Sequence, residues 1–265
     1  MEVLNDINVK ESVGFVCKTT RFGNFKILGY GGCNDVYIEF LDTGYKTKTS
    51  NKEVRYGNIR DRLKPSVFNV GFIGNKYKTS VNHVDAIEYK IWYSMLERCY
   101  SEKVHNVRNT YKDCEVSENF KSYEYFYEWT NKQIGFNVKG FDLDKDLLTK
   151  GCKVYSENSC VFLPSEINTL IIKCDKVRGD CPVGVTYHKS SNNYAAQISM
   201  FGKRKHLGMF NTKLEAFSAY KKAKECHIKE LANKWKSEID ERAYNALMNY
   251  QVEITDWLKL RRNND

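Results

Sequence analysis

The composition of the chain excludes several classes of protein. It has 265 residues, a formal net charge of +9, and 42% hydrophobic and 14% aromatic residues, which supplies a folded core and differs from the composition of disordered chains. No run of about eighteen apolar residues occurs, so no transmembrane helix is expected, and the first residues lack the apolar stretch of a secretory signal. The nine cysteines form no CxxC pairs, which favours reduced thiols in the cytoplasm over a disulfide scaffold.

Residues 1–75 predict a small β-rich domain. Three runs typical of strands, at residues 25–28, 36–41 and 45–49, are separated by Gly-Gly and Asp-Thr-Gly turns. We expect these strands to form a small, barrel-like sheet.

Residues 76–175 predict a mixed helical and β domain. Apolar residues at helical spacing predict a helix over residues 86–100, and a second helix is expected over residues 118–133. Residues 141–171 then have the order strand, loop, strand, helix. The first of these strands carries closely spaced carboxylates, and the second begins after Asn158.

Residues 176–232 predict a small sheet covered by one helix. Alternating apolar and polar side chains predict short strands, and the helix is expected to begin at Thr212, with Glu215 at the spacing of a capping box. The strands are expected at residues 184–185, 194–198 and 206–210, with a turn at Asn192 and Asn193. The helix has an apolar face that can cover the sheet, formed by Leu214, Phe217, Ala219, Tyr220 and Ala223.

The remaining residues, 233–265, predict one further helix over residues 235–262. Its apolar residues recur at intervals of three and four, but the pattern is too short and irregular for a coiled coil. We therefore expect it to pack against the rest of the chain and the protein to be a monomer or a weak dimer. Together the elements predict an α+β fold in two or three small domains.

Positive charge is concentrated in residues 176–232. This segment contains eleven Lys and Arg residues and four Asp and Glu residues, which is a local net charge of +7 out of +9 for the whole chain. Clustered Lys and Arg displace counterions from phosphates, although a solvated basic surface would have the same composition. The charge therefore indicates a polyanionic partner only in combination with a motif.

The motifs of this segment supply that combination. GVTYHK, YAAQI, KRKHLGMF and AFSAYKKA follow the pattern GVxxxK, YxAxI, KxxxLGxF and AxxAYxxA, and the segment resembles the plant ethylene-response-factor (ERF) DNA-binding domain in the shortened form found in phage and mobile-element nucleases. The resemblance implies that the exposed face of the sheet lies in the major groove of duplex DNA. The residues that it would turn toward the bases are Thr186, His188, Gln197, Ser199, Arg204 and His206.

Phosphate contacts are expected from a second set of residues, Lys189, Lys203 and Lys205. Such contacts position a protein without reading sequence. Because most of the base-facing side chains are small or neutral, we expect DNA affinity with a loose sequence preference. Basic residues of the N-terminal domain could also contact phosphates or could equally be solvated loop charges, namely Arg55, Arg60, Arg62 and Lys64.

The middle of the chain resembles the HNH endonuclease family, especially its phage and intron-encoded branch. The matching motifs are WxxMLxRCY at 92–100, LDKDLL at 143–148 and KVYSxxxCVFLPxxxN at 153–168. The N-terminal motifs GNFKILGY, FLDTGY and GNIRDRLKPSV resemble a module that often precedes such nucleases. The resemblance implies a ββα-metal site that cleaves DNA.

In that site, Asp144 and Asn168 are expected to bind one Mg²⁺ or Mn²⁺, and Asn158 to orient the catalytic base. Asp142 and Asp146 are possible additional ligands. Oxygen ligands suit a hard cation, which would polarise the scissile phosphate.

The sequence departs from the family at Lys145, which stands where the family has its catalytic histidine. An exposed lysine is a poor base near pH 7, although burial can lower its pKa, and it could instead stabilise charge on the transition state. Two interpretations stay open: an active nuclease with altered chemistry, and a degenerate domain that only binds DNA. His83 or His105 could supply a base, but a lone histidine is more often structural.

The predicted function is a metal-dependent DNA endonuclease of the homing type, encoded by a phage or mobile element and acting in the cytoplasm of a bacterial host. The alternative is a DNA-binding or regulatory protein without cleavage activity; an RNA-directed role is less favoured by the ERF-like sheet. We expect no small-molecule cofactor and no membrane partner. Four cysteines without short paired spacing favour buried thiols over a structural Zn²⁺ site: Cys99, Cys114, Cys152 and Cys160.

Overall fold

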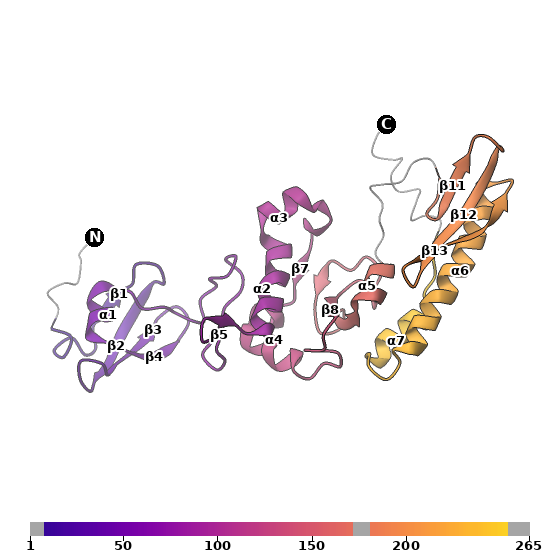
Figure 1. Ribbon diagram of the computed structural model, residues 1–265. Helices are drawn as coiled ribbons and strands as arrows, with labels where there is room; N and C mark the ends of the chain where they lie inside the picture. The colour runs from indigo at the N-terminus through magenta and orange to yellow at the C-terminus, as the bar shows by residue number, and fades with distance from the viewer. Residues whose placement is uncertain (1–7, 172–180, 254–265) are drawn as a thin grey trace. The chain divides into compact units, whose positions relative to one another are not determined.

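A computed structural model describes residues 8–171 and 181–253, and the chain forms two compact units, residues 1–130 and 131–265 (Figure 1). Both units combine helices and strands, which confirms the predicted α+β class. In the part of the chain that the model describes, no helix is both long and apolar enough to cross a membrane.

The first unit begins with a four-stranded antiparallel sheet in the order β1-β2-β3-β4. The strands are β1 (Val16–Lys18), β2 (Asn24–Tyr30), β3 (Val36–Phe40) and β4 (Lys46–Thr49), followed by helix α1 (Asn51–Tyr56). Alternate residues of β2 and β3, such as Phe25 and Ile38, are fully buried in one core with Val54 of α1. The predicted strands are confirmed, but as an open meander with β1 and β4 at its edges.

The rest of the first unit is mainly helical. Its elements are β5 (Ser80–Val81), β6 (Val84–Asp85), α2 (Ile87–Tyr100), α3 (Glu102–Val107), η1 (Asn109–Tyr111), β7 (Glu115–Val116), η2 (Asn119–Lys121) and α4 (Tyr123–Thr130). The helix predicted over 86–100 is confirmed, and buried Trp92 anchors it by donating from Nε1 to the Phe120 carbonyl at 2.8 Å. The second helix is shorter than predicted, because the Ser122 backbone is extended and its hydroxyl accepts from the N–H of Tyr125.

The second unit opens with a β pair and a helix. Strand β8 (Phe141–Asp144) pairs antiparallel with β10 (Val161–Pro164), helix α5 (Ser165–Ile171) follows directly, and β9 (Val154–Tyr155) lies in the connection. The predicted order of strand, loop, strand and helix is confirmed.

A three-stranded sheet and a long helix follow. Strands β11 (Val185–His188), β12 (Asn193–Met200) and β13 (Lys203–Phe210) form an antiparallel sheet in that order, and α6 (Lys213–Lys234) packs on one face. Thr212 and Glu215 form the predicted capping box. Leu214 is 64% exposed, so its assignment to the buried helix face is wrong. The predicted Phe217 and Tyr220 do cover the sheet, together with Ala216, which was not predicted.

Of the helix predicted over 235–262, residues 241–248 are helical and the other described residues are not. Residues 235–239 form a turn, and α7 (Glu241–Met248) begins after Asp240, whose side chain accepts from the N–H of Arg242. Residues 249–253 are not helical, and Ile254, Trp257 and Leu258 lie outside the described residues. The turn lets Ile239, Ala243 and Leu247 pack back onto the end of α6 in one core.

This core also contains the β8–β10–α5 element. Val161, Leu163 and Ile167 are buried together with Leu231 of α6 and Leu247 of α7. The predicted nuclease-like element and the end of the helix that supports the second sheet therefore share their apolar interior.

Gly184 provides a direct test of the packing of α6 on the sheet. Its φ is +74°, and a Cβ at this position would lie 2.0 Å from a ring carbon of Tyr220. Gly184→Ala is expected to lower the free energy of unfolding by about 2 kcal/mol or more, measured by urea denaturation. Gly202→Ala is a matched control with the same φ of +74° and open space around the added methyl, and it should cost only about 1 kcal/mol of backbone strain. Equal losses of unfolding free energy in Gly184→Ala and Gly202→Ala would contradict the packing of Tyr220 on Gly184.

Candidate functional site

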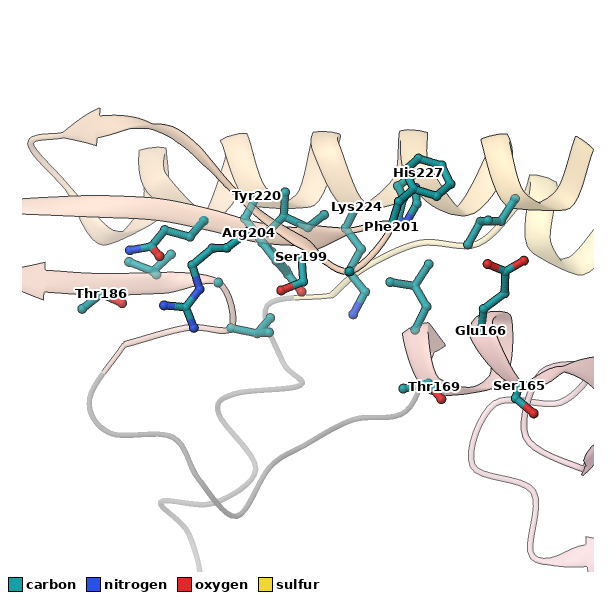
Figure 2. A pocket seen from close by; sticks show the side chains of 18 of the residues that line it. Ser165, Glu166, Thr169, Thr186, Ser199, Phe201, Arg204, Tyr220, Lys224 and His227 are labelled. Atoms are coloured by element: carbon teal, nitrogen blue, oxygen red, sulfur yellow. The ribbon is translucent and has the colours of Figure 1, made fainter. Parts of the chain in front are cut away.

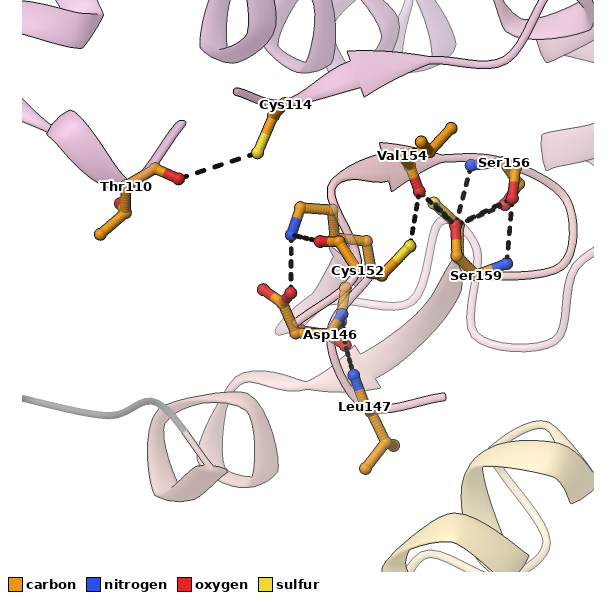
Figure 3. Close-up of polar contacts among 11 residues, drawn as sticks. Thr110, Cys114, Asp146, Leu147, Cys152, Val154, Ser156 and Ser159 are labelled. Carbon is orange, nitrogen blue, oxygen red and sulfur yellow. Dashed lines mark hydrogen bonds and ion pairs between the residues drawn. The ribbon is translucent and has the colours of Figure 1, made fainter. Parts of the chain in front are cut away.

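Asp144 ends β8 with a side chain that turns back into the following loop. The residue is 8% exposed, and its Oδ2 accepts hydrogen bonds from the backbone N–H groups of Asp146 at 2.9 Å and Leu147 at 2.8 Å (Figure 3). Aspartate side chains commonly form such turns with the backbone two and three residues ahead. Among the described residues, both hydrogen bonds to this carboxylate go to Oδ2.

Burial raises the pKa of Asp144 above its ordinary value. The negative charge of Asp146 acts in the same direction, whereas the backbone hydrogen bonds from Leu147 and Asp146 and the positive charge of Lys145 oppose it. The ionised carboxylate is therefore destabilised by its surroundings, and a nearby cation would relieve that cost.

The β8–β10 register places Asp144 opposite Val161. Cross-strand partners project from the same face of a sheet, and Val161 packs with Ile167 of α5 in the shared core. Asn168, the next residue of α5, is partly buried. The two predicted metal ligands thus belong to one β8–β10–α5 element.

The other predicted residues of this site are more exposed. Asn158 lies exposed in the turn before β10, a turn shaped by hydrogen bonds between Ser156 and Ser159 (Figure 3). Asp146 has a side chain that is 58% exposed. No group of three or more His, Cys, Asp and Glu residues suited to a metal occurs among residues 8–171 and 181–253. The donors available are the oxygens of Asp144 and Asn168, whose chemistry fits a hard divalent cation that keeps several waters.

Lys145 is buried and engaged by the loop. It is 5% exposed, and its Nζ donates to the Cys152 carbonyl at 2.6 Å and to Asp146 Oδ1 at 2.6 Å. The same ammonium lies 5.6 Å from the centroid of the Tyr155 ring. Lys145 therefore joins the two ends of the loop between β8 and β9.

Replacement of Lys145 by methionine should destabilise the protein, because the side-chain volume is kept while both hydrogen bonds are lost. We expect Lys145→Met to lower the free energy of unfolding by about 1–3 kcal/mol, measured by urea denaturation. Lys150→Met is the control, since Lys150 is exposed and its ion pair with Glu253 at 2.9 Å lies at the surface, where such pairs contribute about 0–1 kcal/mol. An unchanged free energy of unfolding in Lys145→Met would show that the loop does not depend on the ammonium.

The second sheet separates the predicted DNA-contacting residues onto its two faces. On the face opposite α6, the register pairs Ser199 with Arg204 and, beyond a β-bulge, Gln197 with His206. Thr186 and His188 of β11 alternate with buried Val185 and project from this same open face. The six residues predicted to face bases therefore share one surface.

Two of the predicted phosphate-binding lysines lie on the other face. Lys205 pairs with Ile198 and Lys203 with Met200, and both partners pack toward α6. Both lysines are exposed because β13 is an edge strand. Lys189 follows β11 in the turn before β12. Lys203 and Lys205 thus flank the open face and are not part of it.

A groove that was not predicted from the sequence lies beside this sheet. The groove has a volume of about 990 Å³ and lies between α5, the sheet and α6 (Figure 2). Phe201, Arg204 and His227 are among its lining residues. One signal was available: Phe201-Gly202 occupies a two-residue hairpin turn in which Asn-Gly would be expected.

The cysteines and histidines considered above lie in different local environments. Burial raises the pKa of the Cys160 thiol to about 12, Cys114 Sγ donates to the Thr110 carbonyl at 3.8 Å and Cys152 Sγ to the Val154 carbonyl at 3.3 Å (Figure 3). Cys99 is buried. His105 Nε2 contacts the Arg98 carbonyl at 3.0 Å, and His83 is exposed at a φ of 64°.

Comparisons with protein-family models, curated proteins and solved structures found no match to this chain.

Proposed function

We propose that the protein is a metal-dependent DNA endonuclease with an HNH-like site in the β8–β10–α5 element and a DNA-binding surface on the β11–β12–β13 sheet. The observation that carries the proposal is the buried Asp144 at the end of β8, opposite Val161, which shares a core with Ile167 of α5. A desolvated carboxylate with a raised pKa is typical of functional sites.

Asp144 and Asn168 would hold one Mg²⁺ or Mn²⁺. When bound, the cation supplies Lewis-acid stabilisation of charge on a phosphate and its leaving oxygen. Lys145 keeps the loop after Asp144 closed through its contacts with Cys152 and Asp146, and so fixes the direction of the carboxylate. Exposed Asn158 is available to orient a base or a water molecule.

The second sheet would hold the duplex. Its open face presents a basic residue, Arg204, among neutral hydrogen-bonding side chains such as Gln197 and Ser199. This composition suits contacts to many base sequences with limited discrimination, since the strongest direct readout comes from several bidentate arginines. Exposed lysines beside this face are available for phosphates.

The direct experiment is cleavage of supercoiled plasmid DNA by the full chain with Mg²⁺ or Mn²⁺, compared with the same reaction in EDTA. The proposal expects nicked or linear product with metal and none with the chelator. Cleavage that persists in EDTA would exclude the proposed chemistry.

A second candidate is a DNA-binding or regulatory protein that does not cleave. The observation that favours it is the burial of Lys145, which stands where the HNH family has its catalytic histidine and whose ammonium is hydrogen-bonded within the loop. Duplex binding without metal-dependent cleavage would select this candidate. Absence of both binding and cleavage would reject the two together.

A further inference from the structure

The β12–β13 hairpin ends in an aromatic residue with an unfavourable backbone conformation. Phe201 has a φ of 50° and Gly202 a φ of 74°, as in a type I′ turn, for which Asn-Gly is the favoured pair. A bulky residue with positive φ is a strained exception. The Phe201 side chain is also 63% exposed, so burial does not offset the strain.

The ring of Phe201 contacts a buried histidine of α6. His227 of α6 is 3% exposed, and its ring meets that of Phe201 edge-on, with centroids 4.6 Å apart and an interplanar angle of 76° (Figure 2). Within the described residues its Nδ1 makes no hydrogen bond and lies 3.6 Å from a carboxylate oxygen of Glu230. Backbone strain and an unsatisfied polar atom therefore occur at one place, which indicates selection for something other than stability.

The groove beside this tip has the charge and size for a nucleotide. Its volume of about 990 Å³ lies at the upper end of the range for ligand sites, about 300–1,000 Å³. Arg204 and Lys224 line it together with the hydroxyls of Thr186 and Ser199.

Among the residues that the structure describes, one carboxylate, that of Glu166, also lines the groove. It is hydrogen-bonded to Lys234 Nζ at 2.6 Å and to the Trp235 indole, and these contacts lower its pKa. The charge of Glu166 is thus neutralised by Lys234. The basic side chains of Arg204 and Lys224 then favour an anion in the groove.

We propose that the Phe201 tip and the groove beside it bind an unpaired nucleotide of a DNA duplex, with the base stacked on the Phe201 ring and its phosphate near Arg204. Exposed aromatic rings beside basic side chains are the usual means of holding unpaired bases, because every base has a π face. This inference rests on the proposed DNA binding and adds a preference for a locally unpaired site. Strain at the tip is the means by which the ring stays outside the protein core.

The test uses the full chain and two duplexes of the same sequence, one fully paired and one with a single bulged nucleotide, with affinity measured by fluorescence anisotropy. The wild type is expected to bind the bulged duplex about tenfold more tightly, in keeping with the contribution of one stacked base. Phe201→Asn should remove this preference and leave binding to the paired duplex unchanged. The same variant should raise the thermal unfolding midpoint, because Asn tolerates a positive φ.

Two controls make the outcome decisive. Leu214→Asn removes another apolar side chain of similar exposure, 64%, and should keep the preference. Phe201→Trp keeps a stacking surface and should keep it as well. Equal affinity of the wild type for both duplexes, or a preference that survives in Phe201→Asn, overturns the inference and leaves duplex binding intact. Failure to bind either duplex would instead reject the proposed function.

Discussion

Asp144→Asn is expected to reduce metal-dependent cleavage by at least about a hundredfold and, at the same time, to raise the thermal unfolding midpoint at neutral pH. The amide keeps an oxygen that can accept the N–H groups of Asp146 and Leu147, so the loop is retained while the charge needed for the cation is lost. Plasmid cleavage and thermal denaturation of the same preparation measure the two effects.

The gain in stability follows from the raised pKa of Asp144. The folded state binds this proton more tightly than the unfolded state, so the wild type loses stability as the pH rises from the ordinary pKa of aspartate through the raised folded value. Above that window the ionised carboxylate is a constant cost. The amide variant should lack this pH-dependent loss, and its advantage over the wild type should disappear in acid.

Asp142→Asn is the matched control two residues earlier on the same face of β8. Asp142 is exposed and accepts from the Ser165 hydroxyl at 2.7 Å, and its replacement should change cleavage by less than about threefold, in the range of surface substitutions. Addition of Mg²⁺ or Mn²⁺ should raise the midpoint of the wild type and of Asp142→Asn, but not of Asp144→Asn. Full cleavage by Asp144→Asn would remove Asp144 from the metal site.

Arg204→Ala is expected to weaken duplex binding by about tenfold and to reduce the salt dependence of binding by about one unit of slope. The double variant Lys203→Ala, Lys205→Ala removes two charges, but from the α6 side of β13, and should have the smaller effect. Affinity measured by anisotropy at several salt concentrations compares the variants.

The comparison is informative because net charge and position on the sheet predict opposite orders for the affinity losses of the two variants. If net charge alone governed binding, the double lysine variant would lose more affinity than Arg204→Ala. That order would place the DNA on the β13 edge and not on the open face. His206→Ala, next to Arg204, should also weaken binding, because its side chain shares the open face.

Local patterns were sufficient to predict the second sheet and its helix. Alternation along β12 fixes which side chains meet α6, because a shift of one residue would expose Ile198 and bury Ser199. The capping box of Thr212 and Glu215 depends only on neighbours three residues apart. Such features need no knowledge of distant contacts.

Features that depend on distant contacts were predicted less well. The periodicity of residues 235–250 is compatible with one helix, yet Ile239 and Leu247 reach the shared core only because the chain turns before Asp240. The role of Lys145 depends on the Cys152 carbonyl across the loop, which no spacing rule reveals. The resemblance to a catalytic family predicts a chemical role for Lys145, whereas the burial of Lys145 indicates a structural contribution.

The shared core of β8, β10, α5, α6 and α7 also limits how the chain can be recombined. A cut between α5 and β11 would separate side chains such as Ile167 and Leu231 that exclude water together, so neither fragment would retain this shared core. A graft of the second sheet onto another protein would therefore have to carry the β8–β10–α5 element with it. Exchange of modules during evolution or engineering is expected to be tolerated near residue 130, where the two compact units meet in sequence, and the β8–β10–α5 element and the second sheet would then be inherited as a pair.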